Sequence, residues 1–381
     1  MTSYIPYGRQ SIDALDKKFV NEALFSEKIT TGKYVYLFEK RLKSFLGAKY
    51  LKVCNNGTAA LHLAYEALNL KKGDNIIMPV VNFISAYRIA KLLDLNVILI
   101  DVDPFTGQLD LYKLKKFLKN NKKKIKAILT MYLGGYPENI NEIIKIKNKL
   151  KCFLIEDGCH ALGASYRIDN KNYKVGCGKH ADATIFSFHP IKTITTAEGG
   201  AVILKKKEHF STASKFIAHG FIKKSHWHYD IRKLGMNYRL SDINCALGIS
   251  QLKKIKKFIY KREKIYKLYK SFFLNLKNYF TLPKYSKEIK PAYHLFLLHF
   301  NENKIKKNKN QIFRYFLKNK IILQQHYVPI NHFSFFKKKE SFLNANKYIK
   351  TVFSLPIYYN LSEKKIKLVK KIFLKLIKIN K

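Results

Sequence analysis

The lysine at position 192 differs from most other basic residues of this chain in its neighbours. The sequence contains 73 Lys and Arg residues, many of them in runs of two or three. Lys192 instead lies in the segment SFHPIKTITTAEGG, among apolar and hydroxyl side chains, between the apolar runs ATIFSF and GAVIL. Partial desolvation lowers the pKa of an amine, which lets it attack an aldehyde carbon and later carry protons as a base. A lysine of this chain without such apolar and hydroxyl neighbours would be interpreted as an ordinary surface residue.

A carboxylate comes at the end of another apolar run. Asp157 closes the segment CFLIED and begins EDGCHALGA. At the ligand-binding edge of a sheet, such a carboxylate could keep a pyridine nitrogen protonated and make the ring an electron sink. The alternative is an Asp that caps a following helix. His160, three residues on, could bond the hydroxyl of such a ring or simply stand at a helix start.

A third segment, NNGTAALHLAYEAL, predicts a strand end, a turn with a glycine and a helix that begins at Thr58. The unpaired N–H groups and the dipole of a helix start attract an anion, and the Thr hydroxyl adds a donor. This segment therefore predicts a phosphate site. Thr58 is equally suited to be the ordinary N-cap of the helix, so both interpretations stay open at this point.

These motifs need a scaffold that brings strand ends together. Short apolar runs alternate with helical patterns from about residue 50 to 205, which favours a largely parallel sheet covered by helices. Ligands bind such sheets at the carboxyl ends of the strands. The fold class predicted is therefore α/β, with a mostly parallel seven-stranded sheet in a large domain. The predicted strands are LKVCN, NIIMP, VILIDV, KAILTMY, CFLIED, ATIFSF and GAVIL.

A second, smaller unit is expected after the sheet. A long helical pattern begins near Ser241, and beyond it the runs AYHLFLLHF and IILQQHYVP precede an amphipathic terminal helix. A chain of 381 residues exceeds the size at which one hydrophobic core keeps growing. We therefore predict a large domain at residues 1–255 and a small α/β domain at 256–381.

The composition limits the function classes. The net charge of +47 is compatible with nucleic-acid binding. The charge is mostly Lys and is spread along the chain, however, which favours a general Lys-rich composition on solvent-exposed faces. Five Cys without a C-x-x-C pair indicate neither a disulfide framework nor a zinc site. No apolar stretch has the length of a membrane span. We expect a cytoplasmic protein with no metal, no membrane contact and no nucleic-acid partner.

Taken in order, the motifs resemble those of a known family. NNGTAAL, EDGCHALGA, SFHPIKTITTAEGG and GMNYRLSDINCALG follow one another as in the sugar aminotransferases of the DegT/StrS type, which are fold type I enzymes dependent on pyridoxal 5'-phosphate (PLP). The resemblance implies that Lys192 forms the Schiff base with PLP and that Asp157 bonds its pyridine nitrogen. It also implies a homodimer with shared active sites. The other cofactor residues it implies are Asn56, Gly57, Thr58 and Ser187 at the phosphate, His160 at the ring hydroxyl, Phe83 stacked on the ring, and Asn237 from the other subunit.

Within this family the chain is most similar to the aminotransferases of pseudaminic acid biosynthesis, in which L-glutamate supplies the amino group for C4 of a UDP-linked 4-keto-6-deoxy-N-acetylhexosamine. The supporting segments are AHGFIKK, HYVPI and FSLPIYYNL. The chain departs from this group at Asn56 and Gly57, where a small hydroxyl residue and Ala are expected, and this leaves the hexose open. The substrate residues that the resemblance implies are Tyr7, Lys28, Thr30, Gln324, His326 and Tyr327.

Two alternatives remain. The first is an aminotransferase for another nucleotide-linked 4-ketosugar, of the perosamine or legionaminic type. A sugar dehydratase of the same fold is disfavoured, because those relatives have a histidine in place of the lysine and this chain keeps Lys192. The more distant alternative is a basic protein that binds nucleic acid, which leaves Asp157 and the segment SFHPIK without a purpose.

Overall fold

The computed structural model describes residues 4–337 and 340–379. Its centre is a seven-stranded sheet with the order β1-β9-β8-β5-β4-β2-β3, in which β9 alone runs antiparallel to its neighbours. All seven predicted strands are present, so the predicted fold class is confirmed. The strands are β1 Tyr50–Cys54, β2 Asn75–Pro79, β3 Asn96–Ile100, β4 Ile125–Met131, β5 Phe153–Asp157, β8 Ala183–Ser187 and β9 Gly200–Leu204.

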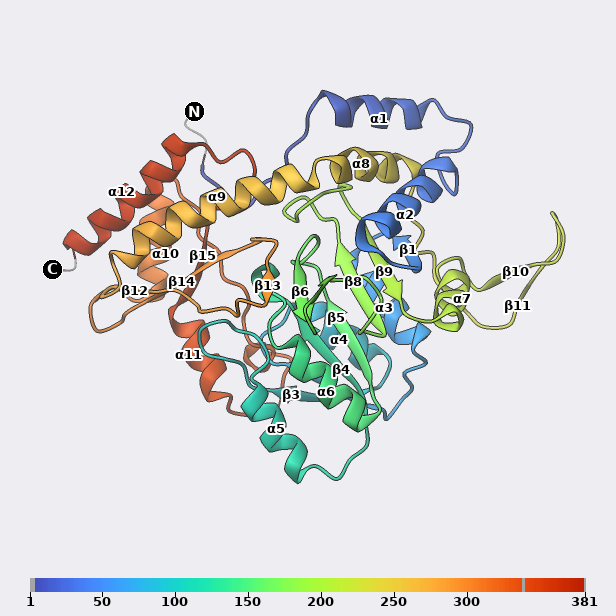
Figure 1. The fold of residues 1–381 in the computed structure, drawn as a ribbon, viewed down its shortest axis with the longest axis horizontal. Coiled ribbons are helices and arrows are strands. Elements are labelled where there is room, and N and C mark those ends of the chain that lie inside the picture. Colours follow the sequence, from blue (N-terminus) through green and yellow to red (C-terminus); the bar gives the residue numbers. More distant parts are fainter. Residues whose placement is uncertain (1–3, 338–339, 380–381) are drawn as a thin grey trace.

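Helices cover both faces of this sheet (Figure 1). Successive strand residues enter opposite cores: Met78 of β2 packs with one set of helices and Ile77 with the other, as the alternation of side chains along a strand requires. The first face is covered by α3 Gly57–Ala67, α4 Ile84–Leu92, α7 Lys207–Phe216 and α11 Leu343–Thr351. The second is covered by α2 Lys33–Leu46, α5 Leu111–Asn120, α6 Ile140–Leu150 and α8 Asp242–Lys253.

A third core lies beside the sheet and belongs mainly to the last third of the chain, with Ile5 added from the N-terminal segment. It is built on β12 Phe280–Thr281, β14 Phe296–Phe300 and β15 Val352–Leu355, with α9 Ile255–Leu274, α10 Lys309–Lys318 and α12 Glu363–Ile379. Helices α8 and α9 run one after the other below α1 in Figure 1 and lead from the sheet to this core. The predicted boundary between residues 255 and 256 stays a prediction.

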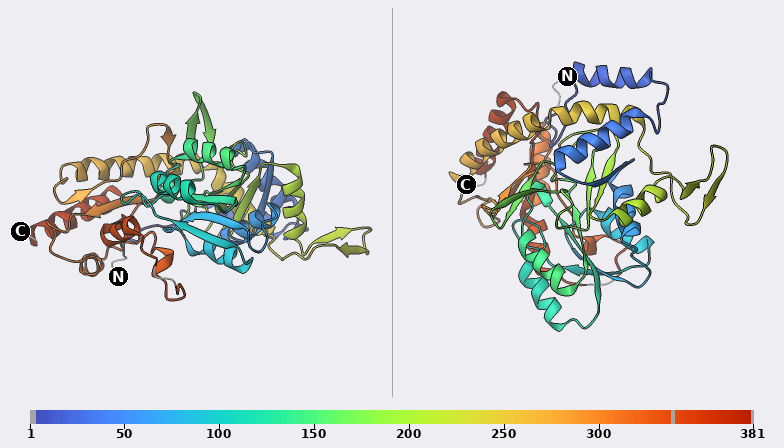
Figure 2. Two further views of the ribbon diagram at one scale, coloured as in Figure 1. Left: turned by 90° about the horizontal axis from the view of Figure 1, so that it is seen from below. Right: turned by 45° about the vertical axis from the view of Figure 1, so that its right-hand side comes forward.

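Two hairpins have no counterpart among the predicted elements. β6 Ser165–Ile168 pairs with β7 Lys171–Lys174 and with β13 Ile289–Lys290. β10 Phe221–Lys223 and β11 Tyr229–Ile231 form a hairpin that projects away from the rest of the molecule (Figure 2). Residues 221–239, the hairpin and the segment that follows it, are called the arm below.

Three smaller elements complete the fold. Helix α1, Ala14–Leu24, begins with a capping box of Asp13 and Asp16, which satisfies donors at a helix start. Two short 3₁₀ helices occupy Leu133–Gly135 and Ile330–His332. Within the described residues, no helix combines the length and the apolar character that crossing a bilayer requires.

Candidate active site

A cavity of about 460 Å³ opens at the carboxyl ends of the central parallel strands. Met131, Asp157 and Ser187, the last residues of β4, β5 and β8, all line it, which is where a parallel sheet presents ligand-binding groups. Most of the residues proposed from the sequence meet here. They are Tyr7, Asn56, Gly57, Thr58, Phe83, Asp157, Ser187, Lys192, Gln324, His326 and Tyr327.

Lys192 and Asp157 face the same cavity from neighbouring strand ends. Burial lowers the pKa of the Lys192 amine, although Cys159 and Asp157 act in the opposite direction. Burial also raises the pKa of Asp157, whose carboxylate accepts the backbone N–H of Cys159 at 3.1 Å. No helix follows Asp157, so its interpretation as a helix cap is wrong. Since desolvation disfavours charge, both groups lie where a bound partner can set their protonation.

The start of helix α3 forms another wall of the cavity. Its N-cap is Asn56, whose side-chain oxygen accepts the N–H of Ala59 at 2.8 Å. The interpretation of Thr58 as N-cap is therefore wrong: the helix begins one residue earlier, and Thr58 Oγ1 bonds Ser85 Oγ at 2.8 Å instead. The N–H groups of Gly57 and Thr58 find no acceptor among the described residues, as is usual at a helix start.

Gly57 keeps this helix start close to the end of strand β8. A Cβ atom at position 57 would lie 3.0 Å from Ser187 Cβ and 3.4 Å from Cys159 Sγ, so a larger residue would displace the wall. The free N–H groups, the hydroxyls of Thr58 and Ser187 and the helix dipole thus converge on one end of the cavity. This arrangement suits a phosphate group.

His160 lies behind the cavity wall and does not line it. The residue is 1% exposed, and both of its ring nitrogens are engaged, with the N–H of Gly134 and the hydroxyl of Tyr327. It is not on a helix, so the helix-start interpretation is wrong. Phe83, in contrast, is half exposed and stands in the cavity 5.6 Å from the Tyr327 ring, between centroids.

The segment with Gln324, His326 and Tyr327 is held against strand β15. The backbones of Gln324 and Ser354 exchange two hydrogen bonds, and His326 Nδ1 lies 2.9 Å from Ser354 Oγ. Burial lowers the pKa of His326 to about 3, which keeps the ring neutral. Tyr7 reaches the same region from the N-terminal segment, with its ring centroid 5.3 Å from that of His326.

Besides His160, three of the proposed residues do not line the cavity. Lys28, Thr30 and Asn237 are exposed and do not line it. Thr30 pairs with Ser241, and Asn237 pairs with Ala218. All three therefore belong to the surface near the start of helix α8, and one copy of the chain does not bring them to Lys192.

The cavity also contains residues that the sequence analysis did not propose. Cys159 and Glu198 stand inside motifs quoted for other residues, and Gln325 lies between two proposed ones, so proximity in the sequence was the available signal. Ser85 lies two residues after Phe83, so the same signal was available for it, and only its bond to Thr58, 27 residues away, needed the structure. The remaining lining residues are Leu61, Met131, His189 and Ile191.

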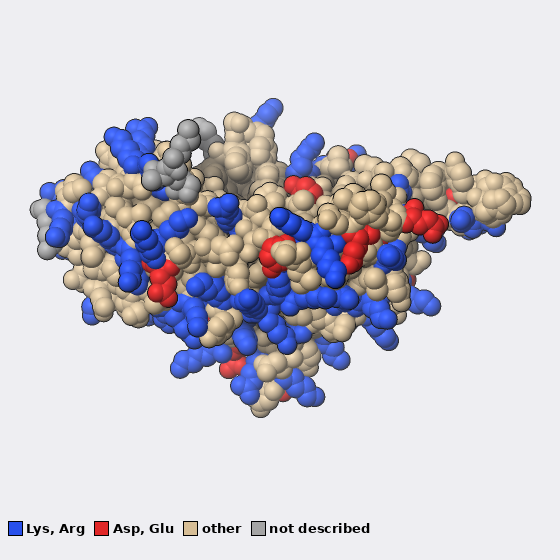
Figure 3. Space-filling model, turned by 90° about the horizontal axis from the view of Figure 1, so that it is seen from above, with Lys and Arg blue, Asp and Glu red and all other residues tan. Residues whose placement is uncertain are grey.

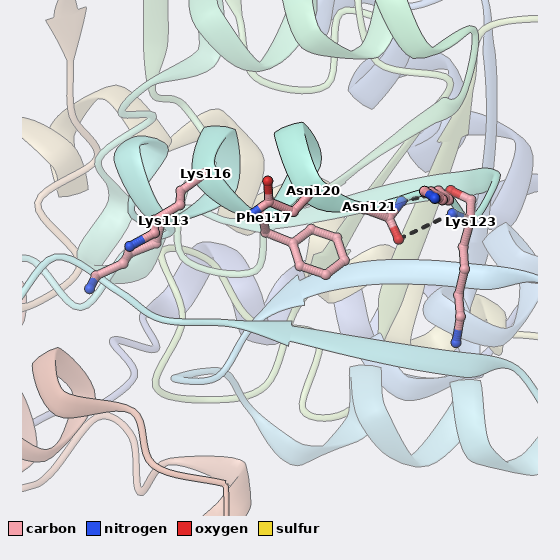
Figure 4. A pocket seen from close by; sticks show the side chains of 7 residues that line it. Lys113, Lys116, Phe117, Asn120, Asn121 and Lys123 are labelled. Carbon is pink, nitrogen blue, oxygen red and sulfur yellow. Dashed lines mark hydrogen bonds between the residues drawn. The ribbon is translucent and has the colours of Figure 1, made fainter.

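Size alone does not identify the site. A shallow hollow of about 720 Å³ lies on helix α5, and in Figure 4 Lys113 and Lys116 stand at one end of it and Lys123 at the other. It brings together no acid, base and nucleophile as the cavity at the strand ends does. Figure 3 likewise shows Lys and Arg scattered over one face of the molecule, with few acidic groups between them.

The cavity holds a desolvated lysine and a desolvated carboxylate, and one end of it can bind an anion. These features define an enzyme site at the edge of an α/β sheet. The chain belongs to the DegT/DnrJ/EryC1/StrS aminotransferase family, whose model matches residues 10–373. The family predicted from the motifs, and its aminotransferase class, are confirmed.

Three relatives show how far the similarity extends. The chain is 39% identical over 371 residues to the UDP-4-amino-4,6-dideoxy-N-acetyl-beta-L-altrosamine transaminase of Campylobacter jejuni strain 81-176, with 96% of each chain covered. It is 32% identical over 295 residues to the GDP-perosamine synthase of Escherichia coli O157:H7, with 77% and 76% covered. Among solved structures, Helicobacter pylori PseC, an aminotransferase involved in the biosynthesis of pseudoaminic acid, matches with a TM-score of 0.91 and 30% identity over 99% of this chain and 100% of its own.

Proposed function

We propose that this protein is a PLP-dependent aminotransferase that moves the amino group of L-glutamate to C4 of a UDP-linked 4-keto-6-deoxy-N-acetylhexosamine, in pseudaminic acid biosynthesis. The observation that carries the proposal is the cavity in which Lys192 and Asp157 meet the start of helix α3, in a chain 39% identical to a transaminase of that sugar.

The residues present fit PLP. A volume of about 460 Å³ lies inside the range of small-ligand sites, roughly 300–1,000 Å³. The helix start at Gly57, which lies close to Ser187 because Gly57 has no Cβ, provides the phosphate end. The same cavity is lined by the amine of Lys192 and the carboxylate of Asp157. When bound, PLP supplies an aldehyde for the amine of the donor and a ring that accepts electrons.

The chain's own groups divide the work. Lys192 Nζ would hold the cofactor covalently through its aldehyde carbon, with loss of water, and once displaced would move a proton from the donor's Cα. The depressed pKa of Lys192 keeps a larger share of its amine unprotonated for both tasks. Asp157 would keep a proton on the ring nitrogen, and Phe83 would lie against the ring face.

The sugar would occupy the side of the cavity lined by Tyr7, Gln324, His326 and Tyr327. These side chains offer hydrogen bonds and apolar faces but no cation, so the diphosphate needs positive charge from elsewhere. Lys28 and Thr30, which also stay candidates for the sugar nucleotide, are exposed outside the cavity.

A homodimer with shared sites would supply what one copy lacks. The arm carries large apolar side chains in the open: Trp227 is 73% exposed and Leu234 81% exposed. Apolar groups on a projecting hairpin indicate a contact surface. We propose that this surface packs on a second copy and brings the partner's Asn237 to the cofactor. The five cysteines are free thiols, which agrees with a cytoplasmic location.

The second candidate is an aminotransferase for another nucleotide-linked 4-ketosugar. It is favoured by the 32% identity to a GDP-perosamine synthase and by Asn56 and Gly57, which depart from the pattern of the pseudaminic acid enzymes. Both candidates use the same cofactor chemistry and differ in the sugar nucleotide.

The test is a panel of UDP-, GDP- and dTDP-linked 4-ketosugars offered with L-glutamate, with the amino sugar identified by mass spectrometry and NMR. We expect amination of the UDP-linked sugar at C4. Turnover of a GDP-linked sugar alone would establish the second candidate. A colourless protein that PLP does not reconstitute, and that retards DNA with steep salt dependence, would instead favour the distant alternative of a nucleic-acid-binding protein.

A further inference from the structure

His160 and Tyr327 form a pair that links the buried layer behind the cavity to the cavity itself. The two residues are 167 positions apart in the sequence, and His160 Nε2 lies 2.9 Å from the Tyr327 hydroxyl. Tyr327 lines the cavity, while His160 is buried behind it against the ring of His294, with centroids 4.2 Å apart. The direction of the hydrogen bond within this pair decides what Tyr327 offers to a ligand.

The other nitrogen of His160 settles its tautomer. The backbone N–H of Gly134 donates to His160 Nδ1 at 3.2 Å. A backbone amide can only donate, so Nδ1 must carry a lone pair. Burial, together with the nearby Lys192 and His294, lowers the pKa of His160 well below its usual value. The neutral ring therefore has its single proton on Nε2.

Nε2–H must then donate to the Tyr327 oxygen. The opposite direction, in which Tyr327 donates to Nε2, would leave both nitrogens of His160 without a proton. That state is an imidazolate anion, which a buried ring does not reach at physiological pH. The hydrogen of the Tyr327 hydroxyl consequently points away from His160. The oxygen has no second partner among the described residues.

The backbone around Tyr327 keeps this geometry in place. The Tyr348 hydroxyl donates to the carbonyl of His326, and Gln324 pairs with Ser354 of β15. The segment that leads into Tyr327 is therefore held at two points, and Tyr327 itself lines the cavity.

We infer that His160 is a positioning residue that makes Tyr327 a one-way donor, so that the Tyr327 hydroxyl gives its proton in a hydrogen bond to an acceptor oxygen of the bound ligand. This oxygen belongs either to the ring of the cofactor or to the ketosugar. The inference rests on the proposed function for the identity of these ligands. It also means that His160 reaches the ligand only through Tyr327, because both of its own nitrogens are occupied.

The tautomer is tested directly in the holoenzyme. With ¹⁵N-labelled histidine, the NMR resonances of His160, assigned through a His160→Gln variant, should show an unprotonated Nδ1 and a protonated Nε2 from about pH 6 to pH 8. A protonated Nδ1 would overturn the inference.

The role of the pair is tested with three variants and two readouts. The readouts are the absorbance band of bound PLP with its pH midpoint, and the single-turnover rate with UDP-linked 4-keto-6-deoxy-N-acetylhexosamine. We expect Tyr327→Phe to change one of them: a shifted midpoint if the acceptor is the ring oxygen, or a loss of about 10- to 100-fold in rate if it is the sugar. His160→Phe should reproduce that change, and His160→Gln, whose amide can still donate to Tyr327, should restore part of it.

Because the two residues act as one unit, the double variant with Phe at both positions should lose no more than Tyr327→Phe alone. Tyr112→Phe, on the exposed face of α5, is the matched control and should behave as the parent. If Tyr327→Phe changes neither readout, or changes one that His160→Phe leaves at the parental value, the inference is wrong.

Two further safeguards keep the test decisive. His160→Phe could fail to fold, which thermal unfolding and loss of PLP absorbance would show. The inference is then tested by comparing His160→Gln with the parent and by the ¹⁵N measurement. If the parent itself transfers no amino group to the ketosugar, the proposed substrate fails, whereas the tautomer and the midpoint of the PLP band still test the inference.

Discussion

The cavity and the arm show opposite physical properties. In the cavity, Asp157 is 3% exposed and burial shifts the pKa values of both Asp157 and Lys192. On the arm, polar Asn237 and apolar Trp227 alike stand in solvent. Asp157 and Lys192 are desolvated within one chain, and this desolvation shifts their pKa values as chemistry requires. Asn237, proposed for the same site, is exposed in one chain and would be buried only against a second one. Under the proposed homodimer, the site would be prepared by one subunit and completed by two.

The largest effect is expected when the amine is removed from the cavity. Lys192→Ala should lower amino transfer by about 10⁴-fold or more, since a base and the covalent attachment are lost together. PLP should stay bound without the covalent link, so borohydride would no longer fix it to the protein. Turnover and the mass of the borohydride-treated chain check both points. Lys113→Ala, on the α5 hollow, is the control, and retained turnover in Lys192→Ala would remove this residue from the mechanism.

A smaller loss is expected at the carboxylate. Asp157→Asn keeps the shape and the acceptor oxygen for the Cys159 N–H but removes the negative charge beside the ring nitrogen. The rate should fall by about 10²- to 10³-fold, with little change in thermal unfolding. Asp74→Asn, at an exposed turn, should leave the rate unchanged. A parental rate in Asp157→Asn would show that this carboxylate only organises its turn.

Mixing two inactive variants tests whether the arm of one copy completes the cavity of another. When Lys192→Ala is refolded with Asn237→Ala, about a quarter of all sites should recover if the partner supplies Asn237, because half of the dimers are mixed and each has one intact site. Turnover and cofactor absorbance at increasing mixing ratios measure this recovery. No recovery, with mixed dimers confirmed by mass, would place both residues in the same chain.

The sequence predicted the parts of the site whose signals are local. Asp157 ends an apolar strand and Lys192 has no charged residues beside it, so a stretch of about ten residues is enough to recognise each of them. The seven strands were equally readable, because strands buried on both faces give continuous apolar runs. The start of helix α3 was placed one residue late, since Asn56 and Thr58 are both good capping residues and only the fold shows that Thr58 bonds Ser85.

What the sequence did not contain is the pairing of distant residues. His160 was expected to bond the ring hydroxyl itself, whereas under the inference above it acts on a ligand only through Tyr327. Its bonds to Gly134 and Tyr327 follow only from the packing of separate segments. The β10–β11 hairpin was also missed. Its strands have three residues each, too few for alternation to be recognised.

The smallest effect, on thermal stability, is expected at two strained backbone positions, one beside the cavity and one beside the arm. Ala197, next to Glu198 at the rim of the cavity, has a φ of +65°, and His219, beside the arm, has a φ of +62°. Alanine has no polar side chain to offset this conformation, whereas histidine tolerates it better. Ala197→Gly should therefore stabilise the protein, by about 0.5–1 kcal/mol.

His219→Gly should stabilise less, because it also removes the contact of the His219 ring with Phe221, with centroids 5.3 Å apart. Thermal unfolding of the two variants beside the parent measures the difference. An equal gain in the free energy of unfolding at both positions would mean that the left-handed backbone alone determines the effect. A lower free energy of unfolding in Ala197→Gly would mean that the rim needs the restricted backbone of alanine. In that case the strain at the cavity would serve to hold Glu198 and the loop of Lys192 in place.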